Sequence, residues 1–268
     1  NTLAAYASPV IGDLPVSEVG IQHIVSILEP IWETKTETAK RLRGRIETVL
    51  AWAAVRGYRT GDNPARWKGH LDAILPAPDK IRQVRHHRAL PWQEAPTFME
   101  QLRQRDGVAA RALEFLILTA ARSAEVRFAT WSEIDLDRAL WTVPADRIKA
   151  GKSHSVPLSA SAIDVLQSIP RFEGTDLIFC APRGGALSDM AVAGVLRRME
   201  VNATPHGFRS SFKDWARTCT TYPDEVSELA LAHVNSDATR AAYARDELLG
   251  QRGHLMEEWA GYLREHSK

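Results

Sequence analysis

A single interval, residues 134–157, interrupts a hydrophobic pattern that is otherwise helical along most of the 268-residue chain. Within it, residues near Ile134 and at 140–143 and 153–157 read as short strands. Turn-forming segments separate them, Asp-Leu-Asp-Arg and then Lys149-Ala-Gly-Lys152. The helical spacing returns after Leu158 and continues to the last residues. We therefore predict a mainly α fold with one small three-stranded antiparallel sheet, an α+β arrangement.

Proline at 76 and 78 divides the chain into two predicted domains. Before the break we expect an irregular lead-in over residues 1–15 and a small helical unit, with helices at 17–28, from 36 to about 56, and at 66–75. After it, helices are expected at 91–105, 107–120, 159–168, 188–199, 207–219, 223–232, 236–244 and 247–264. The predicted organisation is a helical domain over residues 1–80, a basic linker at 81–88 and a second domain at 89–268.

Basic side chains gather in two places, although the formal net charge is only +1. The first group lies on one face of the predicted helix that begins near Thr36: Lys40, Arg41, Arg43 and Arg45. The second group lies in and beside the linker: Lys80, Arg82, Arg85 and Arg88. Each group is either a solvated surface or a phosphate-contacting one, and charge alone does not decide between these roles.

Composition excludes several other classes of protein. Cys180 and Cys219 have no metal-ligand spacing and cannot form a disulfide framework, which fits a reducing compartment. No apolar run approaches the length needed to span a membrane, and no signal peptide is visible. No cluster of carboxylates suggests a metal nuclease. The chain begins with Asn1 rather than Met, so we expect it to be a fragment.

An ordered set of residues carries the chemistry: Arg122, His206, Arg209, His233 and Tyr243. Two arginine forks can hold the non-bridging oxygens of a phosphodiester, a phenol can attack the phosphorus, and histidines can move protons or donate to phosphate. Taken singly, each residue is better explained as a helix cap, a helical ion pair or a packing side chain. The joint order and spacing favour the catalytic interpretation.

That order resembles the tyrosine recombinase, or phage integrase, family. The resemblance covers nearly the whole chain and is strongest in a few phrases, which are Ala121-Arg-Ser-Ala-Glu-Val, Trp131-Ser-Glu-Ile-Asp, His206-Gly-Phe-Arg-Ser-Ser-Phe, Glu228-Leu-Ala-Leu-Ala-His233 and Arg240-Ala-Ala-Tyr243. Three features are similar to the satellite-phage and genomic-island branch: the Trp131 phrase, the Leu-Ala-His ending, and the tail that starts at Gln251 and reads Gln-Arg-Gly-His-Leu-Met-Glu-Glu-Trp-Ala.

The resemblance implies a role for each residue of the set. Arg122 and Arg209 would clamp the phosphate, Tyr243 would attack to give a 3′-phosphotyrosyl intermediate, His206 would act as acid or base, and His233 would hydrogen-bond the phosphate. A lysine in the hairpin turn would protonate the leaving 5′ oxygen; Lys149 fits the family position, and Lys152 is the alternative or a DNA contact. Glu125 would orient Arg122 from behind. One departure is Thr119-Ala120, where the family usually has Thr-Gly, and we expect it to leave the chemistry untouched.

The resemblance also implies the architecture and the partners. Residues 1–80 would be a core-DNA-binding domain and 89–268 the catalytic domain, joined as a C-shaped clamp around double-stranded DNA attachment sites. A homo-tetramer on DNA, accessory directionality or DNA-bending proteins, a bacterial cytoplasmic location, and no cofactor or metal are expected. Two rivals stay open: a DNA-binding module of the same fold without strand-transfer activity, and a type IB topoisomerase-like relaxing enzyme.

Overall fold

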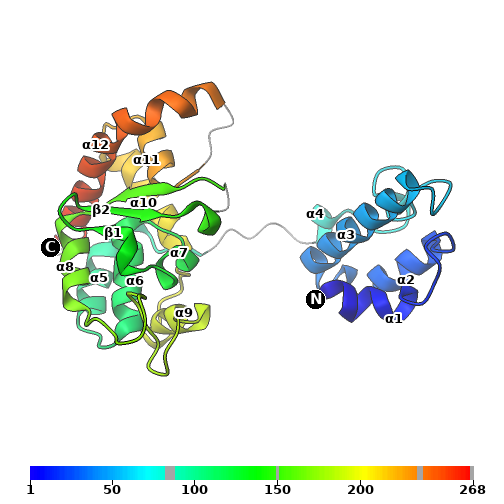
Figure 1. Ribbon diagram of the computed structural model, residues 1–268, viewed down its shortest axis with the longest axis horizontal. Helices are drawn as coiled ribbons and strands as arrows, with labels where there is room; N and C mark the ends of the chain where they lie inside the picture. The colour runs from blue at the N-terminus through cyan, green and yellow to red at the C-terminus, as the bar shows by residue number, and fades with distance from the viewer. Residues whose placement is uncertain (82–87, 149–150, 234–237, 266–268) are drawn as a thin grey trace. The chain divides into compact units, whose positions relative to one another are not determined.

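The computed structural model describes residues 1–81, 88–148, 151–233 and 238–265, with the backbone alone over 238–247. It divides the chain into two compact units, Asn1–His86 and His87–Lys268, each with its own hydrophobic core (Figure 1). Across the described residues, no helix combines the length and the apolar character needed to cross a bilayer.

Unit 1 is helical. It comprises the π-helical turn Leu3–Ala7, α1 Ser8–Ile11, α2 Ile21–Trp32, α3 Thr36–Val55, the 3-10 turn Leu71–Ala73 and α4 Pro78–Ile81. The core forms where α2 packs on α3, because both helices place apolar side chains at helical spacing on the shared face. Ile24 and Leu28 of α2 meet Leu42 and Ile46 of α3 there, all of them buried.

Three expectations for unit 1 are wrong in detail. The first residues are helical rather than irregular, and α2 starts later than expected and continues past Pro30. Proline lacks an N–H, but Pro30 lies in the last turn of α2, where burial of Ile31 and Trp32 offsets the single lost hydrogen bond. The helix expected at 66–75 is reduced to the short Leu71–Ala73 turn.

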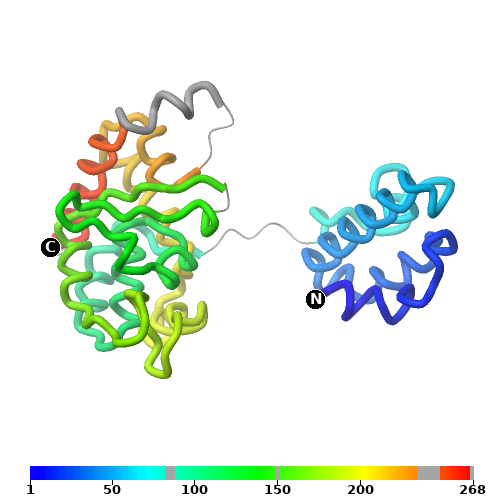
Figure 2. Tube along the Cα trace, viewed as in Figure 1, coloured from blue at the N-terminus to red at the C-terminus, as the bar shows by residue number. Residues whose placement is uncertain are grey.

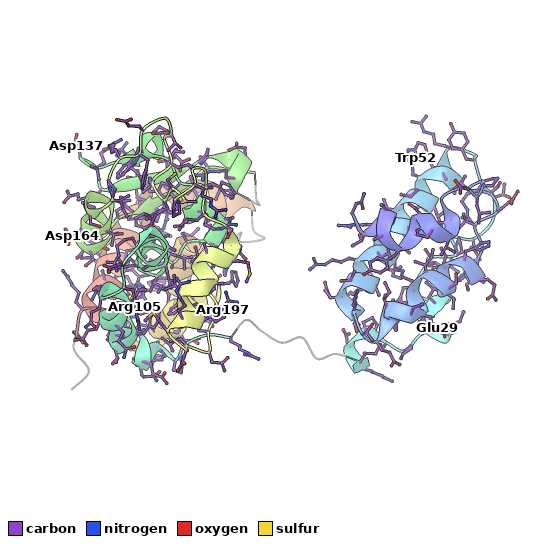
Figure 3. All side chains as sticks on the ribbon, turned by 90° about the horizontal axis from the view of Figure 1, so that it is seen from below. Glu29, Trp52, Arg105, Asp137, Asp164 and Arg197 are labelled. Atoms are coloured by element: carbon purple, nitrogen blue, oxygen red, sulfur yellow. The ribbon has the colours of Figure 1, made fainter. Side chains whose placement is uncertain are left out.

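Aromatic and aliphatic side chains are exposed along the C-terminal half of α3. Trp52 is 56% exposed and projects from the surface of unit 1 (Figure 3). Its ring centroid lies 5.7 Å from that of Tyr58, and Val55 beside them is 88% exposed. This face of α3 therefore lies on the surface, while Leu50 and Ala53 on the opposite face of the helix are buried.

Unit 2 begins with helices and carries the sheet in its first half. Its helices are α5 Ala95–Arg103, α6 Val108–Thr119, α7 Ser123–Arg127, α8 Ala160–Ser168, α9 Asp189–Arg198, α10 Gly207–Cys219, α11 Asp224–Ala230 and α12 Ala238–Tyr262. The prediction of a mainly helical fold with one small antiparallel sheet is confirmed. The helices expected at 236–244 and 247–264 form the single helix α12.

The sheet joins β1 Ile134–Asp135, β2 Leu140–Val143 and β3 His154–Pro157 in the order β1-β2-β3, antiparallel throughout. In the β2–β3 pair, Val143 lies opposite His154 and Leu140 opposite Pro157. The turn between β2 and β3 contains residues 149 and 150, which lie outside the described residues.

α6 forms the centre of unit 2, because its residues 112–119 are buried on every side. α12 packs against α6, α8, α11 and β3, and the orange-red part of the trace in Figure 2 follows this path. The indole of Trp259 on α12 donates to the carbonyl of Ile117 on α6 at 2.9 Å, and the Tyr262 hydroxyl donates to the Trp92 carbonyl at 3.1 Å. These bonds fix the C-terminal half of α12 to the core.

Candidate active site

Arg122 stands directly before the first residue of α7, with an extended backbone. Glu125, 4% exposed, accepts hydrogen bonds from the Arg122 backbone N–H at 2.8 Å and from its guanidinium at 2.9 Å. The same guanidinium donates to the carbonyl of Ala232 at 3.3 Å, more than a hundred residues along the chain. Glu125 thus lies in direct contact with Arg122, as the predicted orienting role requires.

Arg209 lies in the first turn of α10 and is only 4% exposed. Its guanidinium donates to the carbonyl of Ala120 at 2.5 Å and to that of Leu231 at 2.6 Å. The Ala120 carbonyl lies at the end of α6 and the Leu231 carbonyl at the end of α11, where the last carbonyls of a helix have no partner within it. Because these ends also carry partial negative charge, they are suitable anchors for a cation.

The two helix ends turn sharply at alanines in the left-handed conformation, Ala120 with φ 49° and Ala232 with φ 48°. A residue with a β-carbon adopts this conformation at a cost of about 1–2 kcal/mol. Their carbonyls receive Arg209 and Arg122 respectively. Ala120, where the family usually has glycine, therefore contacts the site through its main-chain carbonyl. The expectation from the sequence considered its side chain and overlooked this carbonyl.

The guanidinium groups of Arg122 and Arg209 lie near one another and create a region of strongly positive electrostatic potential. Burial and the charge of Arg122 lower the pKa of Arg209 to about 10, while Glu125 and Glu228 oppose that shift. Arg209 stays charged at neutral pH, and two cations beside each other are a favourable arrangement for binding a phosphate dianion or diester. The chemistry that this place supports best is electrostatic stabilisation of a phosphoryl group.

His233 joins the arginine pair at the end of α11. Its Nε2 atom lies 3.3 Å from a guanidinium nitrogen of Arg209, and its Nδ1 atom lies 2.6 Å from a carboxylate oxygen of Glu228. Its side chain is 48% exposed, so a ligand can reach it. Arg122, Arg209 and His233, far apart in sequence, are thus brought to one place by the ends of α6 and α11.

His206 directly precedes α10 and is exposed. The turn beside it needs glycine, because a β-carbon on Gly207 would come within 2.1 Å of the Arg88 carbonyl oxygen. That carbonyl accepts the Thr204 backbone N–H at 2.9 Å, so the segment at 88 is fixed beside the start of α10. The Arg88 guanidinium donates to Asn202 at 2.6 Å.

His154 and Arg252 belong to the same region, and the sequence patterns did not single them out. Arg252, 6% exposed on α12, donates to the Ser155 carbonyl and lies 3.5 Å from His154 Nε2. Burial, then the charge of Arg252, lowers the pKa of His154 to about 3, with Arg122 and Arg209 adding to the shift and the Ala230 carbonyl opposing it. His154 is therefore a neutral connection between β3, α11 and α12.

His154 makes the stability of unit 2 depend on pH. Its folded pKa of about 3 lies below the ordinary histidine value of 6.5, so its contribution is complete above pH 6.5 and is lost as pH falls from 6.5 toward 3. We expect the free energy of unfolding to fall by up to about 1.4 kcal/mol for each unit by which the pH is lowered in that window. Urea unfolding of wild type and His154→Gln at two pH values isolates this slope, with His254→Gln, exposed on α12, as the control. An equal slope in His154→Gln and wild type would contradict the expectation.

Two members of the predicted set lie outside what the structure describes. Lys149 is outside the described residues, and Tyr243 lies in α12 where the backbone alone is described. Lys152 is exposed in the turn before β3. The roles of these three residues, like those of the rest of the predicted set, stay predictions.

The basic residues predicted to contact DNA differ in their surroundings. Lys40, Arg41 and Arg45 are exposed on α3, with Arg41 paired to Glu37 and Arg45 bonded to Thr2. Arg43 is different, because its largely buried guanidinium donates to Glu47 at 2.6 Å and to the Ala65 carbonyl at 2.8 Å. Lys80 is exposed in α4, while Arg82 and Arg85 lie outside the described residues.

Within the described part of the chain, no three His, Cys, Asp or Glu side chains come together as a metal would require. Cys180 is buried and Cys219 exposed, each as a free thiol.

Solved structures with this fold include two DNA-bound integrases. A λ integrase (75–356) dimer bound to a COC′ core site matches with a TM-score of 0.61 and 20% identity over 91% of this chain and 88% of that chain. The Tn1549 transposon integrase (aa 82–397) in complex with circular intermediate DNA matches with a TM-score of 0.64 and 14% identity over 91% and 87%. At these identities the likeness establishes the fold.

Two protein-family models match the amino-acid sequence. Residues 1–70 match the phage integrase central domain, and residues 88–248 match the phage integrase family. Since the second match covers more than half of the chain, the chain belongs to the phage integrase family, and the family resemblance inferred from the motifs is confirmed.

Similar full-length relatives are integrases of phages and prophages. The integrase of Enterobacteria phage P4 is 28% identical over 97% of this chain and 63% of its own length. Prophage integrase IntZ of Escherichia coli (strain K12) is 31% identical over 94% of this chain and 62% of its own length. The chain therefore spans less than two thirds of the length of these relatives.

Proposed function

We propose that this chain carries out site-specific recombination of DNA, cutting and rejoining strands through a 3′-phosphotyrosyl intermediate to integrate or excise a mobile element. The observation that carries the proposal is the arginine pair. Arg122 and Arg209 are fixed on main-chain carbonyls at the ends of α6 and α11, and His233 contacts Arg209 beside them. Such a place binds the non-bridging oxygens of a phosphodiester and stabilises the additional charge of its transition state.

The proposed chemistry needs no metal. The Tyr243 oxygen attacks phosphorus, the bond to the 5′ oxygen breaks, and the DNA 3′ end becomes an ester of the phenol. The phenolic proton passes to a base, for which we propose His206, and the leaving 5′ oxygen receives a proton from Lys149, with Lys152 as the alternative. Attack by the 5′ hydroxyl of a partner strand reverses these steps and restores the phenol.

The proposed domain roles follow from the family. Residues 1–80 are a core-DNA-binding domain, 81–88 a basic linker and 89–268 the catalytic domain, which together clamp double-stranded DNA. The proposed backbone contacts are Lys40, Arg41, Arg43, Arg45, Lys80, Arg82, Arg85, Arg88 and Lys152. Of these, Arg43 also bonds to Glu47 and to the Ala65 carbonyl within unit 1. Tetramers at attachment sites, accessory DNA-bending or directionality proteins and a location with the bacterial nucleoid complete the proposal.

A covalent-adduct assay tests the proposed function. Nicked duplexes made from the DNA that flanks the source element trap the intermediate, because the released strand diffuses away and cannot religate. We expect a gel band that resists boiling in detergent and contains both the protein and the labelled strand that ends at the 3′-phosphotyrosyl bond. The band should form equally well in excess EDTA. Strand cleavage that leaves free ends and requires a divalent metal would instead indicate a nuclease.

A further inference from the structure

We propose that Glu228 and Lys213 are positioning residues that act through His233, holding its Nδ1–H on Glu228 and directing its Nε2 edge toward the place where Arg209 would bind a DNA phosphate. The effect of this positioning on catalysis rests on the proposed function, whereas the positioning itself is argued from hydrogen-bond geometry. Neither Glu228 nor Lys213 belongs to the predicted catalytic set.

The geometry at Nδ1 assigns the proton. Glu228 places one carboxylate oxygen 2.6 Å from His233 Nδ1 and the other 2.6 Å from Lys213 Nζ. Burial raises the pKa of Glu228, but the hydrogen bonds from Lys213 and His233 outweigh burial, and the pKa is lowered. An ionised carboxylate only accepts, so Nδ1 must carry the hydrogen. The His233 backbone N–H donates to the Glu228 carbonyl at 3.0 Å, which ties the two residues a second time.

The geometry at Nε2 then follows. Arg209 faces Nε2 at 3.3 Å, and a guanidinium only donates, so the DNA-free imidazole is neutral with its Nε2 lone pair toward Arg209. A phosphate oxygen has no proton to give, so Nε2 must gain one before it can bond a phosphate. Glu228 supplies the counter-charge for the imidazolium that results, as an orienting carboxylate does for a catalytic histidine.

Lys213 holds the Glu228 carboxylate in place. It is 8% exposed, and its ammonium contacts Glu228 at 2.6 Å, the Asp224 carboxylate at 2.8 Å and the Ser227 hydroxyl at 2.8 Å. A buried ammonium with two carboxylate partners is compensated in charge and in hydrogen bonds. Lys213 therefore fixes both the first turn of α11 and the carboxylate that reaches His233.

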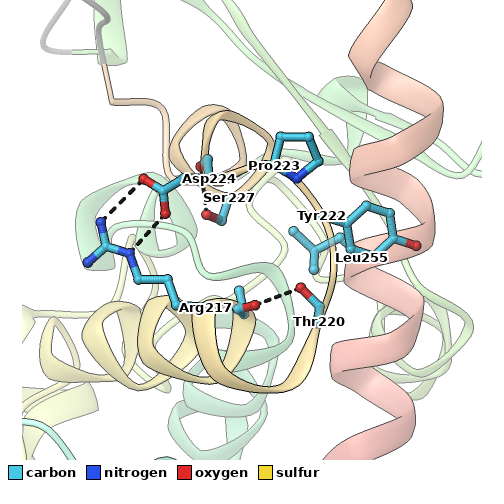
Figure 4. A pocket seen from close by; sticks show the side chains of 8 residues that line it. Arg217, Thr220, Tyr222, Pro223, Asp224, Ser227 and Leu255 are labelled. Carbon is cyan, nitrogen blue, oxygen red and sulfur yellow. Dashed lines mark hydrogen bonds and ion pairs between the residues drawn. The ribbon is translucent and has the colours of Figure 1, made fainter.

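The Lys213–Glu228 contact forms part of a ladder between two helices. Arg209, Lys213 and Arg217 follow each other at four-residue spacing on α10, and Asp224 and Glu228 do so on α11, so each set shares one helix face. Arg217 donates to Asp224 through two nitrogens at 2.9 and 3.2 Å, at the outer end of the ladder (Figure 4). The inner end is His233 with Arg209.

Charged and titratable groups from several elements surround His233. They are Arg209 and Lys213 of α10, Glu228 of α11, Arg122 before α7 through the Ala232 carbonyl, and His154 of β3 through Ala230. Among the residues that the structure describes, Glu228 is the one anion in direct contact with the ring. Removing its charge should therefore release the ring from the orientation that this contact fixes.

The tautomer can be measured directly in the DNA-free full chain. We expect imidazole nitrogen NMR of isotope-labelled protein, with the His233 signals assigned by comparison with His233→Ala, to show hydrogen on Nδ1 and a free Nε2. In water the other tautomer would be the usual one. Hydrogen on Nε2 in the wild type would overturn the proposal, and this result does not depend on any DNA substrate.

Kinetics test the positioning role. Single-turnover adduct formation from about pH 5.5 to 8.5 should be about 10- to 100-fold slower in Glu228→Gln. Lys213→Met should show a smaller change in the same direction, and Glu225→Gln, one turn earlier on α11, should behave as wild type.

A double substitution separates positioning from folding. In the His233→Ala background, Glu228→Gln should slow the reaction less than about twofold, because its effect passes through the ring. A full effect in that background would show that Glu228 acts by another route and would overturn the proposal. If the wild type itself forms no adduct, the proposed function fails, and the tautomer measurement still decides whether Glu228 positions His233.

Discussion

Tyr243→Phe is expected to eliminate the covalent protein–DNA adduct while leaving DNA binding within about twofold of wild type. The substitution removes one oxygen and no charge, so the electrostatic attraction between protein and phosphates is unchanged. Without the phenol there is no nucleophile, and the rate of adduct formation should fall by about three orders of magnitude or more. The nicked-duplex assay and a gel-shift titration measure the two quantities separately.

Tyr222→Phe is the matched control. Tyr222 precedes α11, and its hydroxyl donates to Glu258 at 2.7 Å, away from the arginine pair. We expect its adduct yield to equal that of wild type. An undiminished adduct in Tyr243→Phe would show that another residue is the nucleophile, and peptide mapping of the adduct would then identify it.

Arg209→Gln should cause a loss of comparable size by a different mechanism. An arginine that stabilises a transferring phosphoryl group contributes roughly 10³- to 10⁵-fold to the rate. Glutamine lacks the charge and cannot bond the Ala120 and Leu231 carbonyls and a phosphate together. We expect adduct formation to fall at least about a thousandfold, with weaker DNA binding as a smaller effect.

Arg209→Lys separates charge from geometry. Lysine keeps the charge but has a single nitrogen, whereas the guanidinium reaches two helix ends at once. We expect this variant to remain nearly as slow as Arg209→Gln. Recovery of more than about a tenth of the wild-type rate would show that charge alone accounts for the role of Arg209.

Stability has to be measured beside activity in both arginine variants. Each leaves buried carbonyls without a donor, at a cost of about 1–3 kcal/mol. Arg105→Gln is the matched control, because Arg105 is exposed (Figure 3). Arg105 stands before the first turn of α6, whereas the site lies beyond the last turn of that helix. A twelve-residue helix separates these ends by about 18 Å.

Periodicity alone predicted much of the fold. The change from helical to alternating spacing at residues 134–157 located the sheet, because β2 alternates buried Trp141 and Val143 with exposed Thr142, and the turns between the strands are polar. The limits of helices were less predictable. α12 runs as one helix through Gly250, since packing on α6 and α8 outweighs the preference of glycine for other conformations.

The candidate site was predictable only in part, for a physical reason. Arg122 and His233 stand out because each follows an apolar helix, and Arg209 stands out because it lies three residues after His206. Glu228 does not, because it lies five residues before His233 and reaches it only after α11 has ended and the chain has turned at Ala232. His154 is one residue of a strand, and its link to Arg252 depends on how α12 crosses β3.

The anchoring of the arginine pair on main-chain carbonyls has a consequence for mutational tolerance. Every residue carries a carbonyl, so changing the side chains at 120, 231 or 232 cannot delete an acceptor for Arg209 or Arg122. Only substitutions that alter the backbone turn, such as proline or a β-branched residue in the left-handed conformation, can displace these carbonyls. The site is therefore robust to side-chain drift at its anchors and sensitive to drift in backbone shape.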